Sequence, residues 1–174
     1  TLDLSQVPNL IDLSISINEF TAIDLSAVSN LNGLTCRNNQ LTTLDLSPVP
    51  NLNFLNCDFN ELIALDLSVV PNLLGLNCGF NELTTLDLSS LSNIRNFDCR
   101  NNQLISLFIK NGSQFPFSSS WNFETNPNME YICVDDFELD SVLSKLEDYG
   151  YTNCAANSYC SFVPGGEFYT IEGD

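Results

Sequence analysis

The stretch LDLSPVPNLNFLNCDFNELIA at residues 44–64 decides the fold, because its pattern returns every 21 positions. Similar copies occupy residues 23–43, 65–85 and 86–106, a diverged copy occupies residues 2–22, and a degraded copy follows residue 107. A unit of this length cannot bury its own apolar face and must stack on its neighbours. The period therefore predicts a solenoid of about six coils. Thr1 falls within the pattern, so we expect the chain to be a piece of a longer array.

Each coil should contain a short strand at its Leu-x-Cys tripeptide, such as residues 34–36. Because side chains alternate along a strand, the leucine and the cysteine should point inward and the middle residue outward. Successive cysteines then form a buried column of small apolar fillers, made of Cys36, Cys57, Cys78 and Cys99. A zinc column is disfavoured, because one thiolate per coil at about 4.8 Å forms a line and zinc requires a tetrahedron.

The inner frame L-x-x-L-x-C-x-x-N-x-L at residues 31–41 recurs from Leu52, Leu73 and Ile94. This frame resembles the leucine-rich repeat, over roughly the first 125 residues. The resemblance implies an α/β solenoid, mostly β, that coils right-handed with a parallel sheet on its concave face. It also implies that one asparagine per coil points inward and bonds backbone groups of the turning loop. That column is Asn18, Asn39, Asn60, Asn81 and Asn102.

The opposite side of each coil carries a Leu-Asp-Leu-Ser segment followed by a turn. The outward aspartates of this row are Asp3, Asp24, Asp45, Asp66 and Asp87. They fit either a calcium ladder or a solvated edge in which each carboxylate accepts hydrogen bonds from its own turn. The solvated edge is favoured, because carboxylates about 5 Å apart repel by only about 1 kcal/mol in water and a calcium cage draws on more ligands per coil.

The pattern loosens after residue 106 and predicts a separate C-terminal cap. The repeat array should span residues 1–131, the cap residues 132–160, and a linker or following module residues 161–174. A solenoid must cover its open end, and an amphipathic helix near residues 137–149 is placed to do so. Its apolar side should contain Phe137, Leu139, Val142, Leu143, Leu146 and Tyr149.

Three further cysteines lie outside the repeats. Cys133 falls at the outward aspartate position of its coil, and Cys154 follows the predicted helix. We expect these two to pair and to pin the cap, with a gain of roughly 3 kcal/mol. Cys160 competes for Cys154, but the short loop between them would cap nothing. A disulfide here would imply an oxidising, extracytoplasmic compartment.

Composition excludes several classes of function. With 22 acidic and 5 basic residues the net charge is −17, which repels nucleic acids and anionic membranes. No stretch approaches 18 consecutive apolar residues, so no membrane insertion is expected. Histidine is missing, and so are nucleotide-binding and hydrolase motifs, so the sequence predicts no enzyme, no cofactor and no metal site.

The outward face of the strands varies from coil to coil, and recognition is expected on such a variable surface. Phe54, Phe59 and Phe80 should gather on the third and fourth coils, with Arg37 and Arg100 on either side. Exposed aromatics beside arginine are typical of a binding hot spot. The alternative is that Phe59 and Phe80 only pack on each other along their column. The polar neighbours of the rings are Asn56, Asn77 and Asp98.

These features predict a monomeric, non-catalytic module that binds a protein ligand or mediates adhesion, internalin-like in mode. The segments at residues 126–136 and 159–171 also resemble the end of leucine-rich-repeat regions in secreted surface proteins of Bacteroidetes. That resemblance implies an extracellular or cell-surface location and a partner of Cys160 outside the chain. Two alternatives stay open, a glycan-binding surface in which rings stack on sugars and a structural spacer without a ligand.

Overall fold

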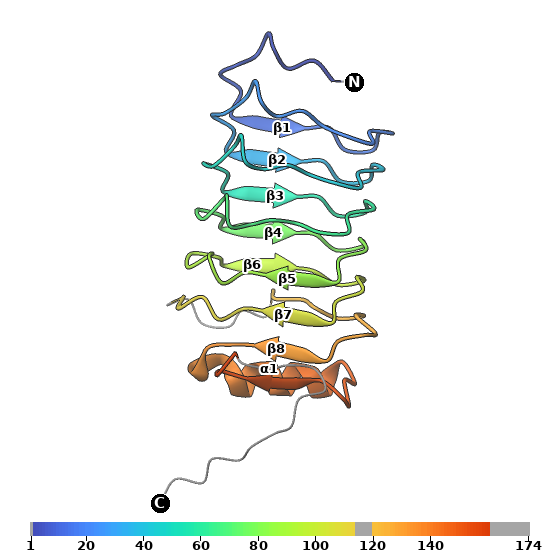
Figure 1. Ribbon diagram of the computed structural model, residues 1–174, viewed down its shortest axis with the longest axis vertical. Helices are drawn as coiled ribbons and strands as arrows, with labels where there is room; N and C mark the ends of the chain where they lie inside the picture. The colour runs from blue at the N-terminus through green and yellow to red at the C-terminus, as the bar shows by residue number, and fades with distance from the viewer. Residues whose placement is uncertain (1, 114–119, 161–174) are drawn as a thin grey trace, which may run out of the picture.

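The computed structural model describes residues 2–113 and 120–160. Over these ranges the chain is a parallel-strand β-solenoid of about seven turns, with one short α-helix at its C-terminal end (Figure 1). The prediction of a leucine-rich-repeat solenoid with a helical cap is confirmed. The expected number of about six coils is one too few, because a final strand follows the cap helix.

Sheet A occupies one side of the solenoid, and its strands begin and end one residue before the predicted Leu-x-Cys tripeptides. Each strand pairs in parallel with its equivalent one repeat later, so that Leu34 lies beside Leu55 and Leu55 beside Leu76. The alternation points the middle residue of each strand toward the core, where Leu34, Leu55, Leu76 and Phe97 are buried and Leu13 is partly buried. In order, its five strands are β1 (Asp12–Ser14), β2 (Gly33–Thr35), β3 (Phe54–Asn56), β4 (Gly75–Asn77) and β6 (Asn96–Asp98).

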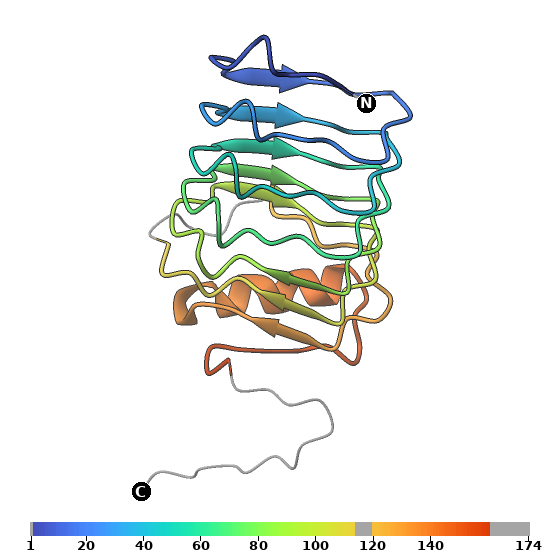
Figure 2. The same cartoon turned by 45° about the horizontal axis from the view of Figure 1, so that its top comes forward.

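Sheet B lies on the opposite side, where the chain runs back, so its arrows point the other way in Figure 2. It forms only from the fifth repeat onward, along the Leu-Asp-Leu column. Its register aligns Asp87, Phe108 and Cys133, so Cys133 does take the aspartate position. Its four strands are β5 (Thr85–Asp87), β7 (Ser106–Phe108), β8 (Tyr131–Cys133) and β9 (Ala155–Asn157).

The core between the sheets consists of columns of equivalent residues from successive coils. The four repeat cysteines are 0% exposed, as predicted, and burial raises the pKa of each thiol, to about 12 at Cys36. The asparagine column is confirmed from Asn39 to Asn102, whereas Asn18 in the end coil is exposed. The Asn81 Nδ2 group donates to three backbone carbonyls, and its Oδ1 accepts from the Leu62 N–H at 3.0 Å.

The cap consists of the 3₁₀ turn η1 (Asp136–Glu138) and helix α1 (Leu139–Asp148). Val142 and Leu146 are buried against the last coil, but Phe137 and Leu143 are exposed, which corrects the predicted apolar side. Phe137 belongs to the 3₁₀ turn and so departs from the helical period. Leu143 is rotated by about 100° from its neighbour Val142 and faces away from the core. Among the described residues, no helix has the length and apolar character needed to cross a membrane.

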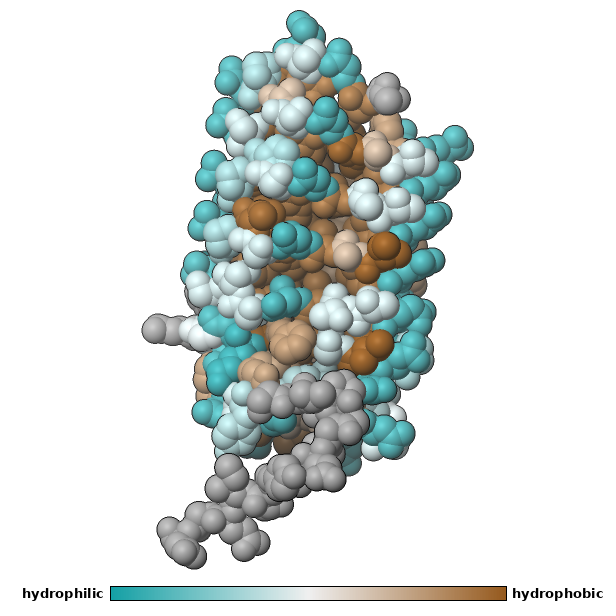
Figure 3. Space-filling model, viewed as in Figure 1, coloured by the Kyte–Doolittle hydropathy of each residue, from teal (hydrophilic) through white to brown (hydrophobic). Residues whose placement is uncertain are grey.

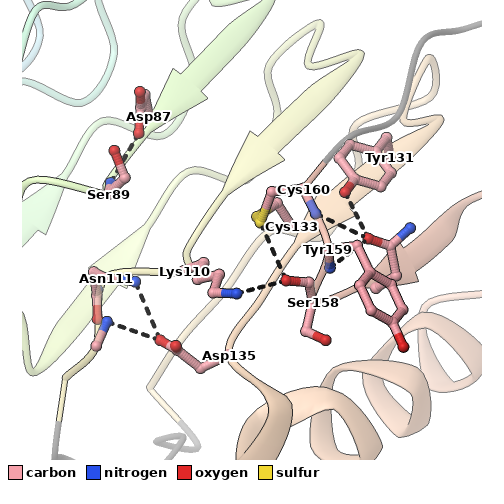
Figure 4. The surroundings of a disulfide bond; sticks show 12 residues. Asp87, Ser89, Lys110, Asn111, Tyr131, Cys133, Asp135, Ser158, Tyr159 and Cys160 are labelled. Carbon is pink, nitrogen blue, oxygen red and sulfur yellow. Dashed lines mark hydrogen bonds between the residues drawn. A yellow bond between two sulfur atoms is a disulfide. The ribbon is translucent and has the colours of Figure 1, made fainter.

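Cys133 is bonded to Cys160, with 5.1 Å between their Cα atoms, so the predicted pairing with Cys154 is wrong (Figure 4). In the register of β8 with β9, Cys133 lies opposite Asn157. Side-chain alternation then places Cys133 on the outer face of the sheet and Cys154 on the inner face. Cys154 is a free thiol that packs against the core, and burial raises its pKa to about 12.

A tight turn returns Cys160 to Cys133. The Asn157 Oδ1 accepts from the backbone N–H groups of Tyr159 and Cys160, at 3.1 and 3.2 Å. Cys160 itself has a φ of 54°, in the left-handed region. The inference that the partner of Cys160 lies outside the chain is therefore wrong as well.

Candidate functional site

The outward face of sheet A is hollowed into a groove of about 530 Å³ that runs along the solenoid axis. Figure 3 shows the other side of the solenoid, the side of sheet B, where hydrophobic atoms lie between columns of hydrophilic ones. The middle residues of the five strands of sheet A form the floor of the groove. One border consists of the first strand residues, Asp12, Gly33, Phe54, Gly75 and Asn96, and the other of the third residues, Ser14, Thr35, Asn56, Asn77 and Asp98.

Phe54 is the one aromatic residue of the first border, and its side chain is 54% exposed. The equivalent residues of the adjacent coils are Gly33 and Gly75. A Cβ placed on Gly75 would lie 3.1 Å from Phe54 Cδ1 and 2.7 Å from Asn96 Oδ1. Glycine at position 75 therefore lets the ring and the amide lean over the backbone of β4.

The second border holds its polar side chains in one fixed orientation. Asn56 Oδ1 accepts from the Asp58 N–H at 3.2 Å, and Asn77 Oδ1 accepts from the Gly79 N–H at 3.3 Å. Asp98 makes the same turn with the Arg100 N–H at 3.1 Å. Because the amide oxygens are engaged, the NH₂ groups of Asn56 and Asn77 remain as hydrogen-bond donors at this border.

Beyond the second border, four side chains form a column that we call the Arg–Phe stack: Arg37, Phe59, Phe80 and Arg100. The two phenyl rings are parallel within 9°, with centroids 4.1 Å apart. Arg37 Cζ lies 5.8 Å from the Phe59 ring centroid, and Arg100 Cζ lies 5.6 Å from that of Phe80. The outer face of each ring is thus covered by a guanidinium, while Phe59 remains 39% exposed.

Each guanidinium of the Arg–Phe stack is held by a carboxylate. Arg37 Nε lies 3.4 Å from Asp58 Oδ1, and Arg100 Nε lies 3.3 Å from Asp98 Oδ2. Burial raises the pKa of Asp58, and the charge of Arg37 opposes that shift. Asp58 was not among the predicted site residues, although its position one repeat after Arg37 is a signal for an ion pair.

Phe59 and Phe80 have φ values of 54° and 52°, in the left-handed region. Asn38 and Asn101 occupy the same position in the adjacent coils, with φ values of 55° and 54°. Asparagine tolerates this conformation, whereas a bulky side chain is strained there by about 1–2 kcal/mol. The stack is therefore built at a cost in backbone energy.

The structure brings together only part of the predicted patch. Arg37, Arg100, Phe59 and Phe80 form the stack, and Asn56, Asn77 and Asp98 lie between the stack and the groove. Phe54 lies at the opposite border, at the start of its strand, and lines the groove without joining the other two rings. The predicted cluster of three phenylalanines is therefore two separate aromatic features.

The aspartate row on the other side of the solenoid is satisfied within its own turns. Each carboxylate accepts from the backbone N–H of the serine two residues later, at 2.8–2.9 Å. At Asp66, hydrogen bonds from the Ser68 hydroxyl and then its N–H lower the pKa of the carboxyl. Within the described residues, no three His, Cys, Asp or Glu side chains are grouped so that they could hold a metal ion.

No protein-family model matches the chain, and no curated protein matches its sequence. Its fold is similar to that of the functional domain of InlJ from Listeria monocytogenes, which includes a cysteine ladder. The two are 26% identical with a TM-score of 0.64, over 77% of this chain and 33% of the InlJ chain. A leucine-rich-repeat protein from Leptospira interrogans matches 88% of this chain and 38% of its own, at 21% identity and a TM-score of 0.59.

The chain thus spans between a third and two fifths of the length of these two solved structures. The fold defines the class as a bacterial-type leucine-rich-repeat solenoid, and this chain has a column of four buried cysteines where InlJ is described with a cysteine ladder. Solenoids of this class are typical protein-interaction modules.

Proposed function

We propose that this chain is a non-catalytic protein-binding or adhesion module of a secreted or cell-surface bacterial protein. It binds through the outward face of sheet A, with the Arg–Phe stack as the energetic centre. The observation that carries this proposal is that two partly exposed phenylalanines occupy strained positions where the adjacent coils have asparagine.

The backbone strain at Phe59 and Phe80 indicates a functional role, because the contacts of the two rings offset little more than the strain energy. Two left-handed phenylalanines cost about 1–2 kcal/mol each. Their stacking returns about 0.5–1.5 kcal/mol, and each exposed cation–π contact about 0.5–1 kcal/mol. Folding alone gains almost nothing over asparagine here, and strained residues that persist on a surface are typical of binding sites.

The composition of the stack matches that of interface hot spots, which are enriched in aromatics and arginine. The ion pairs with Asp58 and Asp98 hold the guanidiniums in place before a partner arrives, which lowers the entropy lost on binding. The stack holds two of the five basic residues of a chain with a net charge of −17. It is therefore suited to a protein partner whose contact segment carries a carboxylate next to apolar side chains.

Two observations support the extracellular setting. The Cys133–Cys160 disulfide is of a kind that persists in oxidising compartments. The repeat cysteines are fully buried and their thiol pKa values are raised by burial, so they would remain reduced and unreactive there.

The test is the double variant Phe59→Asn with Phe80→Asn, which installs the asparagine found at Asn38 and Asn101. Because strain is relieved while stacking is lost, the free energy of unfolding should change by less than about 1 kcal/mol. Proteins captured by the wild-type chain are purified, and their affinities are measured by calorimetry. We expect the double variant to weaken binding at least about tenfold.

The matched control is Phe137→Asn, which removes an exposed ring from the cap. It should leave the affinity unchanged. If the purified partner binds the Phe59→Asn, Phe80→Asn variant as tightly as wild type, the stack is not the site. If no protein is captured, the chain is a spacer and the proposal fails.

A further inference from the structure

We propose that the groove on sheet A is a second, separate site, which binds an uncharged saccharide chain with Phe54 as its aromatic platform. This site is independent of the Arg–Phe stack, because Phe54 lies at the opposite border of the sheet. The two sites can therefore be removed one at a time.

Phe54 is the aromatic ring of this face that is available to a sugar. A pyranose packs its C–H face on the face of an aromatic ring. In the Arg–Phe stack, every ring face is already covered by the other ring or by a guanidinium. Phe54 has glycines as its neighbours along the border, so no side chain at the equivalent positions covers it, and it is 54% exposed.

The border opposite Phe54 carries hydrogen-bonding groups that suit sugar hydroxyls. Asn56 and Asn77 present oriented NH₂ donors, and Thr35 adds a hydroxyl in the preceding coil. These groups repeat at the strand spacing of about 4.8 Å, which is close to the length of one pyranose unit. Sugar hydroxyls can both accept from the amides and donate to carboxylates.

The charge of the groove is negative, which favours an uncharged ligand. Asp12 and Asp98 line the two ends of the groove, and none of its described lining residues is basic. In a chain of net charge −17, such a groove repels sialylated or sulfated glycans and acidic peptides. An uncharged saccharide avoids this repulsion and can still use the carboxylates as hydrogen-bond acceptors.

The groove is long and narrow, which suits a linear chain. Five strands at about 4.8 Å make the groove about 19 Å long, and two residues separate its borders by about 7 Å. This width admits one linear chain along the solenoid axis. The backbone groups of the inner strands are already paired within sheet A, so an extended peptide would find no backbone ladder to join.

The experiment presents the labelled 174-residue chain to an array of neutral, sialylated and sulfated oligosaccharides. Each neutral hit is then titrated by calorimetry. We expect binding to neutral oligosaccharides of three or more units. Phe54→Ala should weaken it at least about tenfold through loss of the platform. Asn77→Asp should weaken it about tenfold, because it keeps the acceptor for the Gly79 N–H and removes the NH₂ donor.

Two controls separate this proposal from the proposed function. Phe59→Asn with Phe80→Asn should leave saccharide binding intact, and Phe54→Ala should weaken protein binding far less than the stack variant does. Asn72→Asp places the same new charge on an exposed turn away from the groove, and it should change nothing.

Three results would overturn the proposal. The first is that no neutral oligosaccharide binds at millimolar concentration. The second is that anionic glycans bind more tightly than neutral ones. The third is that saccharide binding survives Phe54→Ala and is lost in the Phe59→Asn, Phe80→Asn variant. None of these results bears on whether the Arg–Phe stack binds a protein.

Discussion

Single buried asparagines close the turns of this solenoid, and each does so with several hydrogen bonds at once. Asn81 Nδ2 donates to the carbonyls of Cys57, Cys78 and Gly79, and its Oδ1 accepts from the Leu62 N–H. Removing the side chain leaves buried backbone groups unpaired in two adjacent coils. Asn81→Ala should therefore lower the free energy of unfolding by about 3 kcal/mol.

Urea denaturation measures this loss. The control is Asn72→Ala in an exposed turn, which should stay within about 0.5 kcal/mol of wild type. Equal losses at the two positions would show that the asparagine column contributes through local turn propensity and not through its buried hydrogen bonds.

Glu138 in the cap predicts a pH dependence. Its side chain is 1% exposed, neither carboxyl oxygen has a hydrogen-bond partner, and burial, together with the charge of Asp135, raises its pKa from 4.5 to about 7. Because the folded pKa lies above the unfolded one, the native state binds more protons between these values. The free energy of unfolding should therefore fall as pH rises from about 4.5 to about 7.

Unfolding of wild type and Glu138→Gln at pH 5 and pH 8 tests this dependence. The wild type should be more stable at pH 5, by about 1–3 kcal/mol, and the glutamine variant should show no such difference. A slope that persists in Glu138→Gln would assign the effect to other groups.

The residue scale also shows what periodicity can predict. Columns repeated every 21 residues, such as Cys57 and Asn60, were placed correctly because burial follows the period. The left-handed backbone at Phe59 was not predicted, because phenylalanine rarely adopts it and carries no signal for it. Only the equivalent asparagines, Asn38 and Asn101, hint at that conformation.

At the scale of elements, the cap is attached by contacts between β8, β9 and the loop after β7. Asp135 Oδ2 accepts from the N–H groups of Asn111 and Gly112, and Lys110 Nζ donates to the Ser158 carbonyl at 2.6 Å (Figure 4). Helix α1 was predicted from its amphipathic period. Strand β9 was not, because its Ala-Ala-Asn sequence lacks strand propensity and forms only by pairing with β8.

The missed strand explains the wrong disulfide. Cys154 follows the predicted end of the helix, so it was predicted as the partner of Cys133 when no strand was expected after the helix. Pairing of β9 with β8 turns Cys154 to the inner face and brings Cys160 back to Cys133. The register of β9 against β8 decides which side chains point to the inner face of the sheet and which to the outer face. The sequence of a three-residue strand does not specify that register.

The disulfide should hold the cap more than it holds the repeats. It closes a separation of 27 residues, which corresponds to about 3.5 kcal/mol of chain entropy. In Cys160→Ser, amide exchange should accelerate in β9 and α1 and remain unchanged in β2 to β4. Cys154→Ser should preserve the exchange pattern, and peptide mapping that joined Cys133 to Cys154 would contradict this assignment.

At the scale of the whole molecule, the strand pairings of the described residues join neighbouring coils. Each inner strand of sheet A pairs with the strand before it and the strand after it. Stability is then close to a sum of coil and interface contributions, and damage to one coil spreads only to its neighbours. Both proposed binding features, the groove and the Arg–Phe stack, are built across several coils and depend on their register.

A leucine in the middle of the array tests this local coupling. Leu55 is 2% exposed in β3, and Leu55→Ala should lower stability by about 2–5 kcal/mol through lost burial and a cavity. Amide exchange should accelerate in β2, β3 and β4, where the neighbours of the cavity lie, while α1 and β9 keep their wild-type protection. The matched variant is Leu13→Ala in the half-buried end strand β1, which should cost less and affect only β1 and β2. A uniform acceleration from β1 to β9 in Leu55→Ala would show instead that all coils unfold as one cooperative unit.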